Sequence, residues 1–335
     1  MPEVHKKQIL SAEVLKLDCE QEARRIAFRL RELLKQDLKR RGYVVAISGG
    51  IDSSVTAALC IKAVGKERIL TLQMPERHSE QEMASLSALL AENLGVESLF
   101  IDITNILEAV GFYGKYTAAV KSVIPEYGEG WKSKIVLPDI VHQRTLSFFS
   151  VVVLSPLGIT IKQRLPLNAY LEVVAATNFK QRIRKMLEYY HADRLNYAVA
   201  GTPNRLEYDQ GFFVKLGDGA ADVKPIAHLY KSQVYQLAEY LGIPEKIRSR
   251  PPTTDTYALP QGQDEFFFSL PYDKMDLCLY AKNNNIPFKE VADATGMTGE
   301  QVQRVFHDID QKRATTHYLH LQSLMMEDVG KTIFP

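Results

Sequence analysis

Apolar positions repeat along the chain with two different periods, and together they predict alternating helices and strands. Between residues 12 and 40 apolar side chains recur every three or four positions with charged residues between them, as in one amphipathic helix. Residues 43–47 form a continuous apolar run instead, which favours a strand buried on both faces of a parallel sheet. The next expected elements are a helix ending near residue 64, a strand at 69–74, a helix at 79–94 and a strand at 98–101. This alternation predicts an α/β fold with a doubly wound parallel sheet and flanking helices.

The middle of the chain, residues 103–166, departs from this alternation. Its apolar stretch at 148–161 is broken by Ser155-Pro-Leu-Gly158, a turn-forming sequence, and this pattern predicts a β-hairpin. Further on we expect a basic helix at about 167–193, a strand at 196–200, a helix at 231–241 and mostly helices over the last sixty residues. We therefore expect one domain over residues 1–335, with a core at about 20–285, an inserted segment at about 104–166 and a helical C-terminal extension at about 286–335.

The composition and the charge of the chain exclude some classes of function. The chain has 335 residues, 46% of them hydrophobic and 24% charged, which is typical of a globular protein. Lys and Arg number 41 and Asp and Glu 40, a balance that argues against a nucleic-acid partner. The three cysteines lie far apart, and no apolar run is long enough to span a bilayer. We expect a cytoplasmic protein with neither a nucleic-acid nor a membrane partner.

The segment Ser48-Gly-Gly-Ile-Asp-Ser-Ser54 stands between the predicted buried strand and a helix. Its glycines allow a tight turn, so that backbone N–H groups, hydroxyls and the positive end of the helix converge, as in phosphate sites. The carboxylate of Asp52 would repel a phosphate unless a cation lay between them, so Asp52 predicts bound Mg²⁺. The alternative interpretation is a plain helix cap made by Ser48 or Asp52.

This loop resembles the SGGxDS pyrophosphate-binding loop of the ATP pyrophosphatases, which cleave ATP into AMP and pyrophosphate. That group includes NAD, GMP, asparagine and argininosuccinate synthetases and tRNA-thiolating enzymes, and the loop alone does not distinguish them. Residues 178–184 (NFKQRIR) resemble the NxKxRxR helix of NAD synthetases. Gly201-Thr202, Glu207, GFFVK at 211–215 and GDG at 217–219 resemble the GT…E…GFxxKxGDG stretch of that family.

The resemblance continues in the same order through Asp222, Pro225, Lys231, PTTD at 252–255, DE at 264–265 and YD at 272–273. It covers roughly residues 20–285 and is specific to NAD synthetase-like proteins. Their fold is the adenine nucleotide alpha hydrolase-like arrangement, which agrees with the fold predicted from the apolar pattern.

The residues support part of a site by themselves. Glu207 and Asp52 would give Mg²⁺ two carboxylate ligands, and Lys215 and Lys231 could neutralise phosphates. The resemblance implies an ATP site made of Ser48, Gly49, Gly50, Ile51, Asp52, Ser53, Ser54, Thr202, Lys231 and Thr253. It implies a deamido-NAD site made of Arg182, Lys215, Asp222 and Lys312. Arg182 and Arg184 lie two apart, about 200° around a helix, and are expected to serve different partners.

Four features depart from the family pattern. Pro203-Asn204 stand where the family commonly has Asp-His, and a second Thr replaces an Ala in 252–255. The stretch 103–166 is longer than expected, and Gln311-Lys312-Arg313 lacks the His of a C-terminal His-Lys-Arg element. The departures leave the expected ATP site intact and concern the second substrate.

Two weaker patterns have simpler interpretations. His317 and His320 have a spacing that could bind a metal, but with no third ligand nearby we interpret them as surface or interface residues. Residues 266–268, three phenylalanines, are more typical of a core or dimer interface than of a base-stacking platform.

The resemblance implies that the protein amidates deamido-NAD to NAD with ammonia and ATP, through an acyl-adenylate, releasing AMP and pyrophosphate. A length of 335 residues leaves no room for a glutaminase domain, so ammonia is expected free or from a separate glutaminase, and the protein is expected to be a homodimer. Two alternatives stay open. One is a related ligase that adenylates and amidates a different carboxylate, and the other is a non-catalytic ATP-binding regulatory module.

Overall fold

Parallel strands form the central sheet of the computed structural model, which describes residues 10–79, 81–137, 149–253 and 257–327. The strands are β1 (Tyr43–Ala46), β2 (Ile69–Gln73), β3 (Glu97–Phe100) and β7 (Ala198–Val199), in the order β3-β2-β1-β7. Tyr43 is paired with Ile69 on one side and with Ala198 on the other. The chain leaves β1 in one direction and later returns to its other side, so β1 marks the switch point of a doubly wound sheet.

The α-helices alternate with these strands and continue beyond them. They are α1 (Cys19–Glu32), α2 (Ile51–Val64), α3 (Gln81–Leu94), α4 (Thr104–Ala109), α5 (Phe112–Lys121), α6 (Leu167–Leu195), α7 (Arg205–Gln210), α8 (Lys231–Tyr240), α9 (Glu245–Arg248), α10 (Tyr272–Asn283), α11 (Phe288–Thr295) and α12 (Gly299–His320). Shorter turns are η1 (Ala12–Leu15), η2 (Leu33–Asp37), η3 (Lys66–Arg68) and η4 (Asp264–Phe268). Within the described residues, no helix is long and apolar enough to cross a bilayer.

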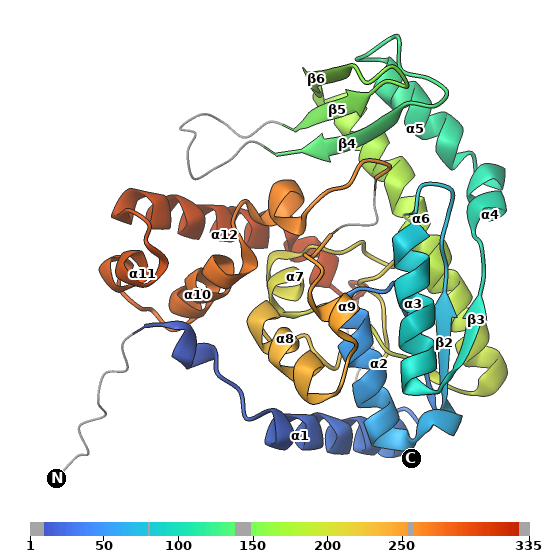
Figure 1. Ribbon diagram of the computed structural model, residues 1–335, viewed down its shortest axis with the longest axis vertical. Helices are drawn as coiled ribbons and strands as arrows, with labels where there is room; N and C mark the ends of the chain where they lie inside the picture. Colours follow the sequence, from blue (N-terminus) through green and yellow to red (C-terminus); the bar gives the residue numbers. More distant parts are fainter. Residues whose placement is uncertain (1–9, 80, 138–148, 254–256, 328–335) are drawn as a thin grey trace.

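Both faces of the sheet are covered, as the continuous apolar pattern of β1 predicts. Tyr43 and Val45 pack with α1, α2, α3 and α8 in one core, whereas Val44 packs with α5 and α6 in a second core. Figure 1 shows α2 and α3 on one face of the sheet and α6 on the other. The predicted α/β fold with a doubly wound parallel sheet is therefore confirmed.

The expectation of one helix from residue 12 to 40 is wrong. The chain forms a short 3₁₀ turn at η1, and α1 begins only at Cys19. The reason is local, because the Asp18 carboxylate accepts a hydrogen bond from the Gln21 amide at 3.0 Å and so caps a new helix. The last turn, η2, widens to π geometry.

Residues 132–136 and 150–164 build a separate antiparallel sheet of β4 (Lys132–Val136), β5 (Ser150–Leu154) and β6 (Thr160–Arg164). The predicted hairpin corresponds to β5 and β6, and the expectation is correct where the structure describes it, from residue 149 onward. Strand β4 was not expected. The hydroxyls of Tyr116 and Tyr127 contact Ser133 Oγ at 2.9 and 3.0 Å, and the Trp131 ring meets the Tyr127 ring with centroids 6.1 Å apart. Hence β4 is fixed to α5 and the turn that follows it.

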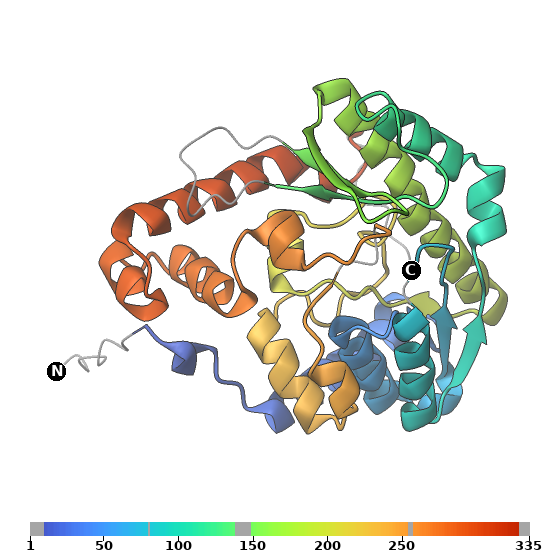
Figure 2. The same cartoon turned by 45° about the horizontal axis from the view of Figure 1, so that its top comes forward.

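The last helices, α10 to α12, form a group with a core of their own beside the parallel sheet, as Figure 2 shows. Helix α12 packs closely on the end of α7. A Cβ atom at Gly211 would lie 2.2 Å from Thr316 Cβ, and Gly211 has a φ of +74°, so both space and conformation require glycine here.

Candidate active site

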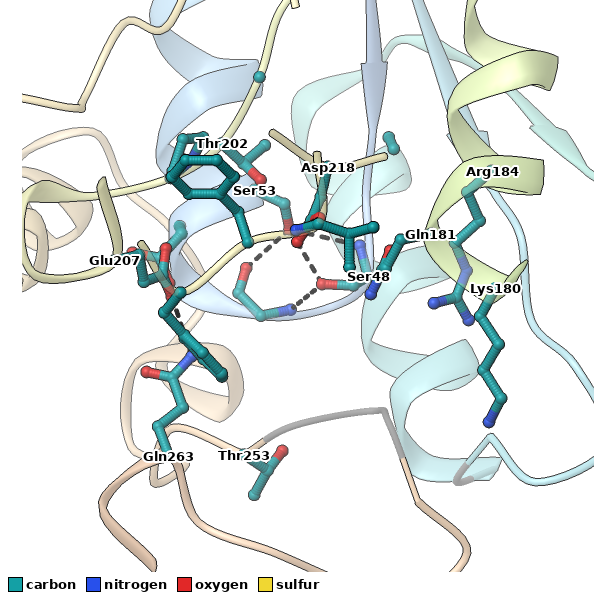
Figure 3. Close-up of a pocket in the computed structure, with 18 of the residues that line it drawn as sticks. Ser48, Ser53, Lys180, Gln181, Arg184, Thr202, Glu207, Asp218, Thr253 and Gln263 are labelled. Atoms are coloured by element: carbon teal, nitrogen blue, oxygen red, sulfur yellow. Dashed lines mark hydrogen bonds between the residues drawn. The ribbon is translucent and has the colours of Figure 1, made fainter. Parts of the chain in front are cut away.

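A cavity of about 530 Å³ opens where β1 and β7 end. Its wall includes the loop after β1, one side of α6, the loop after β7, and parts of the segments 211–218 and 247–267. In open α/β sheets, ligands bind at this position, outside the carboxyl ends of the strands at the switch point. Figure 3 shows the Ser48–Ser53 loop between Glu207 and Gln263 on one side and Lys180 and Arg184 of α6 on the other.

The loop after β1 has the conformation that its glycines predict. Gly49 has a φ of +79°, and a Cβ atom there would lie 2.7 Å from the carbonyl oxygen of Met83. The hydroxyls of Ser53 and Ser54 donate to the Gly50 carbonyl oxygen at 3.0 and 2.8 Å. Among the described residues, no side chain caps α2 at Gly50, so the interpretation as a plain helix cap is not supported. The first amides of α2 are available to an anion.

Asp52 and Glu207 come together through Asn204. The Asn204 side-chain amide donates to Asp52 Oδ1 at 3.1 Å, and its backbone N–H donates to Glu207 Oε2 at 3.1 Å. The Asn204 side-chain oxygen Oδ1 also accepts from the Glu207 backbone amide at 3.2 Å, which caps α7. Gln263 Nε2 donates to the remaining Glu207 oxygen at 3.0 Å. Asn204 therefore sets both the start of α7 and the distance between the two acids.

Lys231 supplies the positive charge of this cluster. Its ammonium group is almost fully buried and donates to Asp52 Oδ2. Asp276 of α10 fixes the backbone at the start of α8 by accepting from the amides of Lys231 and Ser232 at 3.1 and 2.7 Å. Burial raises the pKa of Asp276 to about 6.

The electrostatics of the two acids follow from their closeness. Burial, with the nearby charge of Asp52, raises the pKa of Glu207 to about 8 against the opposing pull of Lys231. Burial alone would lower the pKa of Lys231, but Asp52 and Glu207 outweigh it and the pKa is raised. Burial and Asp52 disfavour the charged form of Glu207, and a further cation at this place would stabilise that charged form.

Helix α6 carries a second set of buried charges along the cavity wall. Lys180 Nζ lies 2.6 Å from Glu76 Oε1, with only 3% and 0% of the two side chains exposed. The Tyr113 hydroxyl donates to the other Glu76 oxygen at 2.8 Å. Arg184 Nε donates to the carbonyl oxygen of Met74 at 3.1 Å. These bonds fix the chain after β2 against α6.

Most of the residues predicted from the sequence line this one cavity. They are Ser48, Gly49, Gly50, Ile51, Asp52, Ser53, Arg182, Thr202, Glu207, Lys215, Lys231 and Thr253. Arg184 lines it as well, so both arginines face the cavity, with different partners: Arg182 Nε donates to the Lys215 carbonyl oxygen at 3.4 Å.

Three predicted residues lie outside the lining. The Ser54 side chain is fully buried beneath the loop. Asp222 Oδ2 accepts from the Val199 amide at 2.7 Å, and Lys312 Nζ donates to Asp308 and to the Phe267 carbonyl oxygen, both at 2.5 Å. The structure thus gives these side chains internal partners in place of the cavity.

Sequence reasoning missed Glu76 and Gln263, and it treated Asn204 only as a departure. None of these residue types stands out in a sequence, because each gains its role from a contact with a distant residue. The nearest signal was the change from Asp-His to Pro203-Asn204 directly before Glu207.

The weaker patterns have structural explanations. His317 and His320 line a separate hollow of about 300 Å³ with Arg205, Tyr208, Asp209 and Arg313. No cluster of three or more potential metal ligands occurs in the part of the chain that the structure describes. The rings of Phe266, Phe267 and Phe268 pack around Phe212, with centroid distances of 5.7, 4.7 and 5.5 Å, as expected for core residues.

A doubly wound parallel sheet with a glycine-rich loop at its switch point is the architecture of nucleotide-binding α/β proteins. Within that class, residues 23–123 and 150–317 match the model of the family described as NAD synthase. The chain belongs to the NAD synthase family. Residues 124–149, which include β4, lie outside the matched parts.

Similar proteins carry the same family name. The chain is 54% identical over 318 residues to the NH(3)-dependent NAD(+) synthetase of Mesorhizobium japonicum, covering 95% of this chain and 100% of the relative. It is also 54% identical to the NH(3)-dependent NAD(+) synthetase of Rhizobium meliloti, covering 96% of each chain.

Solved structures share the fold at lower identity. The NMN synthetase of Francisella tularensis has a TM-score of 0.62 at 21% identity, covering 92% of this chain and 99% of its own. The NH3-dependent NAD synthetase of Campylobacter jejuni has a TM-score of 0.60 at 22% identity, covering 93% and 100%.

Proposed function

We propose that this protein is a ligase that converts deamido-NAD to NAD with ammonia and ATP. One observation carries the proposal: the Ser48–Ser53 loop, Asp52, Glu207 and Lys231 meet in a single cavity of a chain that belongs to the NAD synthase family. The relatives named NH(3)-dependent NAD(+) synthetase, which are 54% identical over nearly the whole chain, support ammonia as the nitrogen donor.

The reaction needs an activated carboxylate. An oxygen of the nicotinate carboxylate forms a bond to the α-phosphorus of ATP, and the bond from that phosphorus to pyrophosphate breaks. The product is an acyl-adenylate, in which AMP replaces oxide as the leaving group. Ammonia then forms the C–N bond, AMP departs, and one proton is released to solvent.

The chain's residues bind and orient the phosphates. The first amides of α2 and the Ser48 and Ser53 hydroxyls surround the place where departing pyrophosphate would lie. The Lys231 ammonium group is desolvated and bound by Asp52, and Asp276 holds the Lys231 backbone amide, so the residue offers a fixed positive charge at low reorganisation cost. Such positioning accounts for catalysis without a side-chain nucleophile.

The donor set at this place fits Mg²⁺. Asp52 and Glu207 are hard oxygen donors close enough to raise the pKa of Glu207, and they lie beside the phosphate loop. Asp52 and Glu207 would hold the ion, and phosphate oxygens and water would complete its shell. When bound, Mg²⁺ supplies positive charge that stabilises the departing pyrophosphate.

The second substrate would occupy the part of the cavity lined by Arg182 and Lys215. Lys215 Nζ donates to the Tyr318 carbonyl oxygen at 2.7 Å, which ties this part of the wall to the end of α12. The proposal also includes a homodimer in the cytoplasm and free ammonia or a separate glutaminase as the nitrogen source. It further includes one domain over the whole chain, with an inserted segment at about 104–166.

A different carboxylate substrate is the second candidate. The fold shared with an NMN synthetase favours it, because that protein's name points to a smaller product on a similar scaffold. Nicotinate mononucleotide is therefore the comparison substrate.

The test mixes purified protein with ATP, Mg²⁺ and ammonium, and offers deamido-NAD, nicotinate mononucleotide or neither. AMP, pyrophosphate and the amide product are measured together. Formation of AMP and NAD in equal amounts, only with deamido-NAD, is the expected result. Turnover with nicotinate mononucleotide alone would assign the second candidate, and ATP binding without turnover would leave a regulatory module.

A further inference from the structure

The outer edge of β4 is covered by a loop from far along the chain. In the order β4-β5-β6, β4 is an edge strand, and the Leu259 amide donates to the Ser133 carbonyl oxygen at 3.3 Å. Two residues further along each segment, Gln261 Nε2 donates to the Ile135 carbonyl oxygen. Lys134 Nζ adds a bond to the Pro260 carbonyl oxygen at 3.2 Å. We call these contacts of residues 133–135 with residues 259–261 the edge contact.

The same loop reaches the acids of the cavity. Gln263, two residues after Gln261, donates through Nε2 to Glu207 Oε1 at 3.0 Å. Its backbone amide donates to the Pro252 carbonyl oxygen at 3.2 Å, and Thr253 pairs with Gly262 as an antiparallel bridge. The loop therefore places Gln263 in the cavity wall and pairs with Thr253, which lines the same cavity.

Strand β4 is a firm support for this loop. Ser133 is 1% exposed and its hydroxyl is held by two buried tyrosine hydroxyls. Gln261 is 2% exposed, and its amide oxygen has no hydrogen-bond partner in the part of the chain that the structure describes. Burying the Gln261 amide oxygen without a partner lowers the stability of the fold. The hydrogen bond from Nε2 to Ile135 is the one bond of this side chain that offsets the loss in the described part of the chain.

We propose that Gln261 is a positioning residue that, through the edge contact, holds Gln263 against Glu207 and so fixes the geometry of the Asp52–Glu207 pair. The inference rests on the proposed function, which supplies the reaction that Asp52 and Glu207 serve. The role of Gln261 itself is argued from the contacts described above. Since β4 lies in residues 124–149, outside the parts that match the family model, the inserted segment supplies this support.

The experiment compares Gln261→Met, Gln263→Met and the double variant with the wild type. Gln261→Asn is a second variant, made in case Gln261→Met does not fold. It keeps an amide, but the shorter side chain cannot reach the Ile135 carbonyl oxygen. Gln236→Met is the matched control, because Gln236 also joins two segments by its side-chain amide, but away from the cavity. Thermal unfolding of every variant verifies the fold.

Three quantities are measured. The first is the affinity for ATP, measured by calorimetry at a series of Mg²⁺ concentrations without the second substrate. It gives the Mg²⁺ concentration at which the effect on affinity is half-maximal. The second is the Mg²⁺ concentration for half-maximal NAD formation. The third is hydrogen exchange of the peptide that contains the Leu259 amide, which reports the edge contact directly.

Both single variants should raise the half-saturating Mg²⁺ concentration about tenfold, because they loosen a group that orients a metal ligand. The double variant should be no worse than the worse single variant, since the two residues act in series. Exchange at Leu259 should increase in Gln261→Met and Gln261→Asn but not in Gln263→Met, and Gln236→Met should match the wild type.

A wild-type Mg²⁺ dependence in folded Gln261 variants, or additive effects in the double variant, would overturn the inference. ATP binding by the wild type that ignores Mg²⁺ would overturn it as well. If the wild type binds ATP with Mg²⁺ but forms no NAD, the proposed function fails, and the calorimetric comparison still decides the role of Gln261.

Discussion

The two sides of the cavity are built in different ways. On the phosphate-loop side, the bonds among Ser48, Gly50, Ser53 and Ser54 that shape the loop join residues at most five positions apart, and among the described residues long-range bonds reach only the Asp52 side chain. On the side of β4 and the loop 257–263, the bonds join distant parts of the chain: Gln261 and Lys134 reach partners 126 positions away, and Gln263 reaches Glu207 over 56 positions.

This difference determines what a substitution can disturb. A change in the short loop acts mainly on bonds within the loop, whereas a change in the other wall acts on contacts between distant segments. The following predictions test whether the two sides differ in function as well as in construction.

The largest effect is expected on the phosphate-loop side. Asp52→Asn keeps the shape and an oxygen acceptor for Lys231 but removes the negative charge toward Mg²⁺. Turnover should fall about a thousandfold, measured as pyrophosphate release. The free energy of unfolding should fall as well, because the buried Lys231 ammonium group loses an anionic partner. Asp37→Asn, an exposed aspartate away from the cavity, is the control. Retained turnover in Asp52→Asn would remove Asp52 from the proposed metal site.

The next effect concerns Lys180 of α6, whose ammonium group pairs with Glu76 in the cavity wall that adjoins both sides. Lys180→Met leaves Glu76 buried without its cation, so the free energy of unfolding should fall by about 3 kcal/mol near neutral pH. Chemical denaturation measures this loss. In the double variant Lys180→Met/Glu76→Gln, part of the stability should return, because no buried charge remains.

The pH dependence of this pair has a defined sign. Burial pushes the pKa of Glu76 up, but Lys180 outweighs it, and the pKa is lowered in the folded protein. The pair therefore stabilises the wild type above the ordinary pKa of a glutamate, and this stability is lost as the pH falls through the lowered value. The difference between wild type and Lys180→Met should shrink on acidification, and a difference that stays constant with pH would contradict the assignment.

A smaller effect is expected at Asn204. Asn204→Ser retains a residue that caps helices well but is too short to bridge to Asp52. Stability should hold while turnover falls about tenfold, as for other residues that orient a metal ligand. Asn204→Ala, which also loses the cap, should lower both quantities. Equal turnover in Asn204→Ser and the wild type would show that the bridge to Asp52 is dispensable.

The smallest effect is expected at the β5–β6 turn. The hydroxyl of Ser155 is buried and accepts from the Ile159 amide at 3.0 Å, so Ser155→Ala should lower the free energy of unfolding by about 1 kcal/mol. Turnover should stay unchanged, because the turn does not line the cavity. A marked loss of turnover would mean that the inserted segment acts on the reaction beyond the edge contact.

The sequence predicted the features that are written in consecutive residues. The alternation of strands and helices, the phosphate loop and the hairpin around Ser155-Pro-Leu-Gly158 each depend on local pattern, and the structure contains all three. The early helix was placed too far forward, because the periodicity ran through Asp18 and hid its capping bond.

Features that depend on long-range contact could not be predicted. Strand β4 has the sequence KSKIV, whose two lysines and serine give no strong strand signal, and its burial comes from tyrosines and a loop elsewhere in the chain. Glu76 and Gln263 are ordinary polar residues until the fold places them beside Lys180 and Glu207. Lys312 matched a family element by position, yet its ammonium group is bound internally.

The position of Trp131 has a practical consequence. It is the single tryptophan of the chain, and it comes directly before β4 with its ring against Tyr127. All tryptophan emission from this protein therefore originates next to the first strand of the antiparallel sheet. A fluorescence titration with nucleotide would report on the surroundings of β4, whereas events confined to the parallel sheet would leave the signal unchanged.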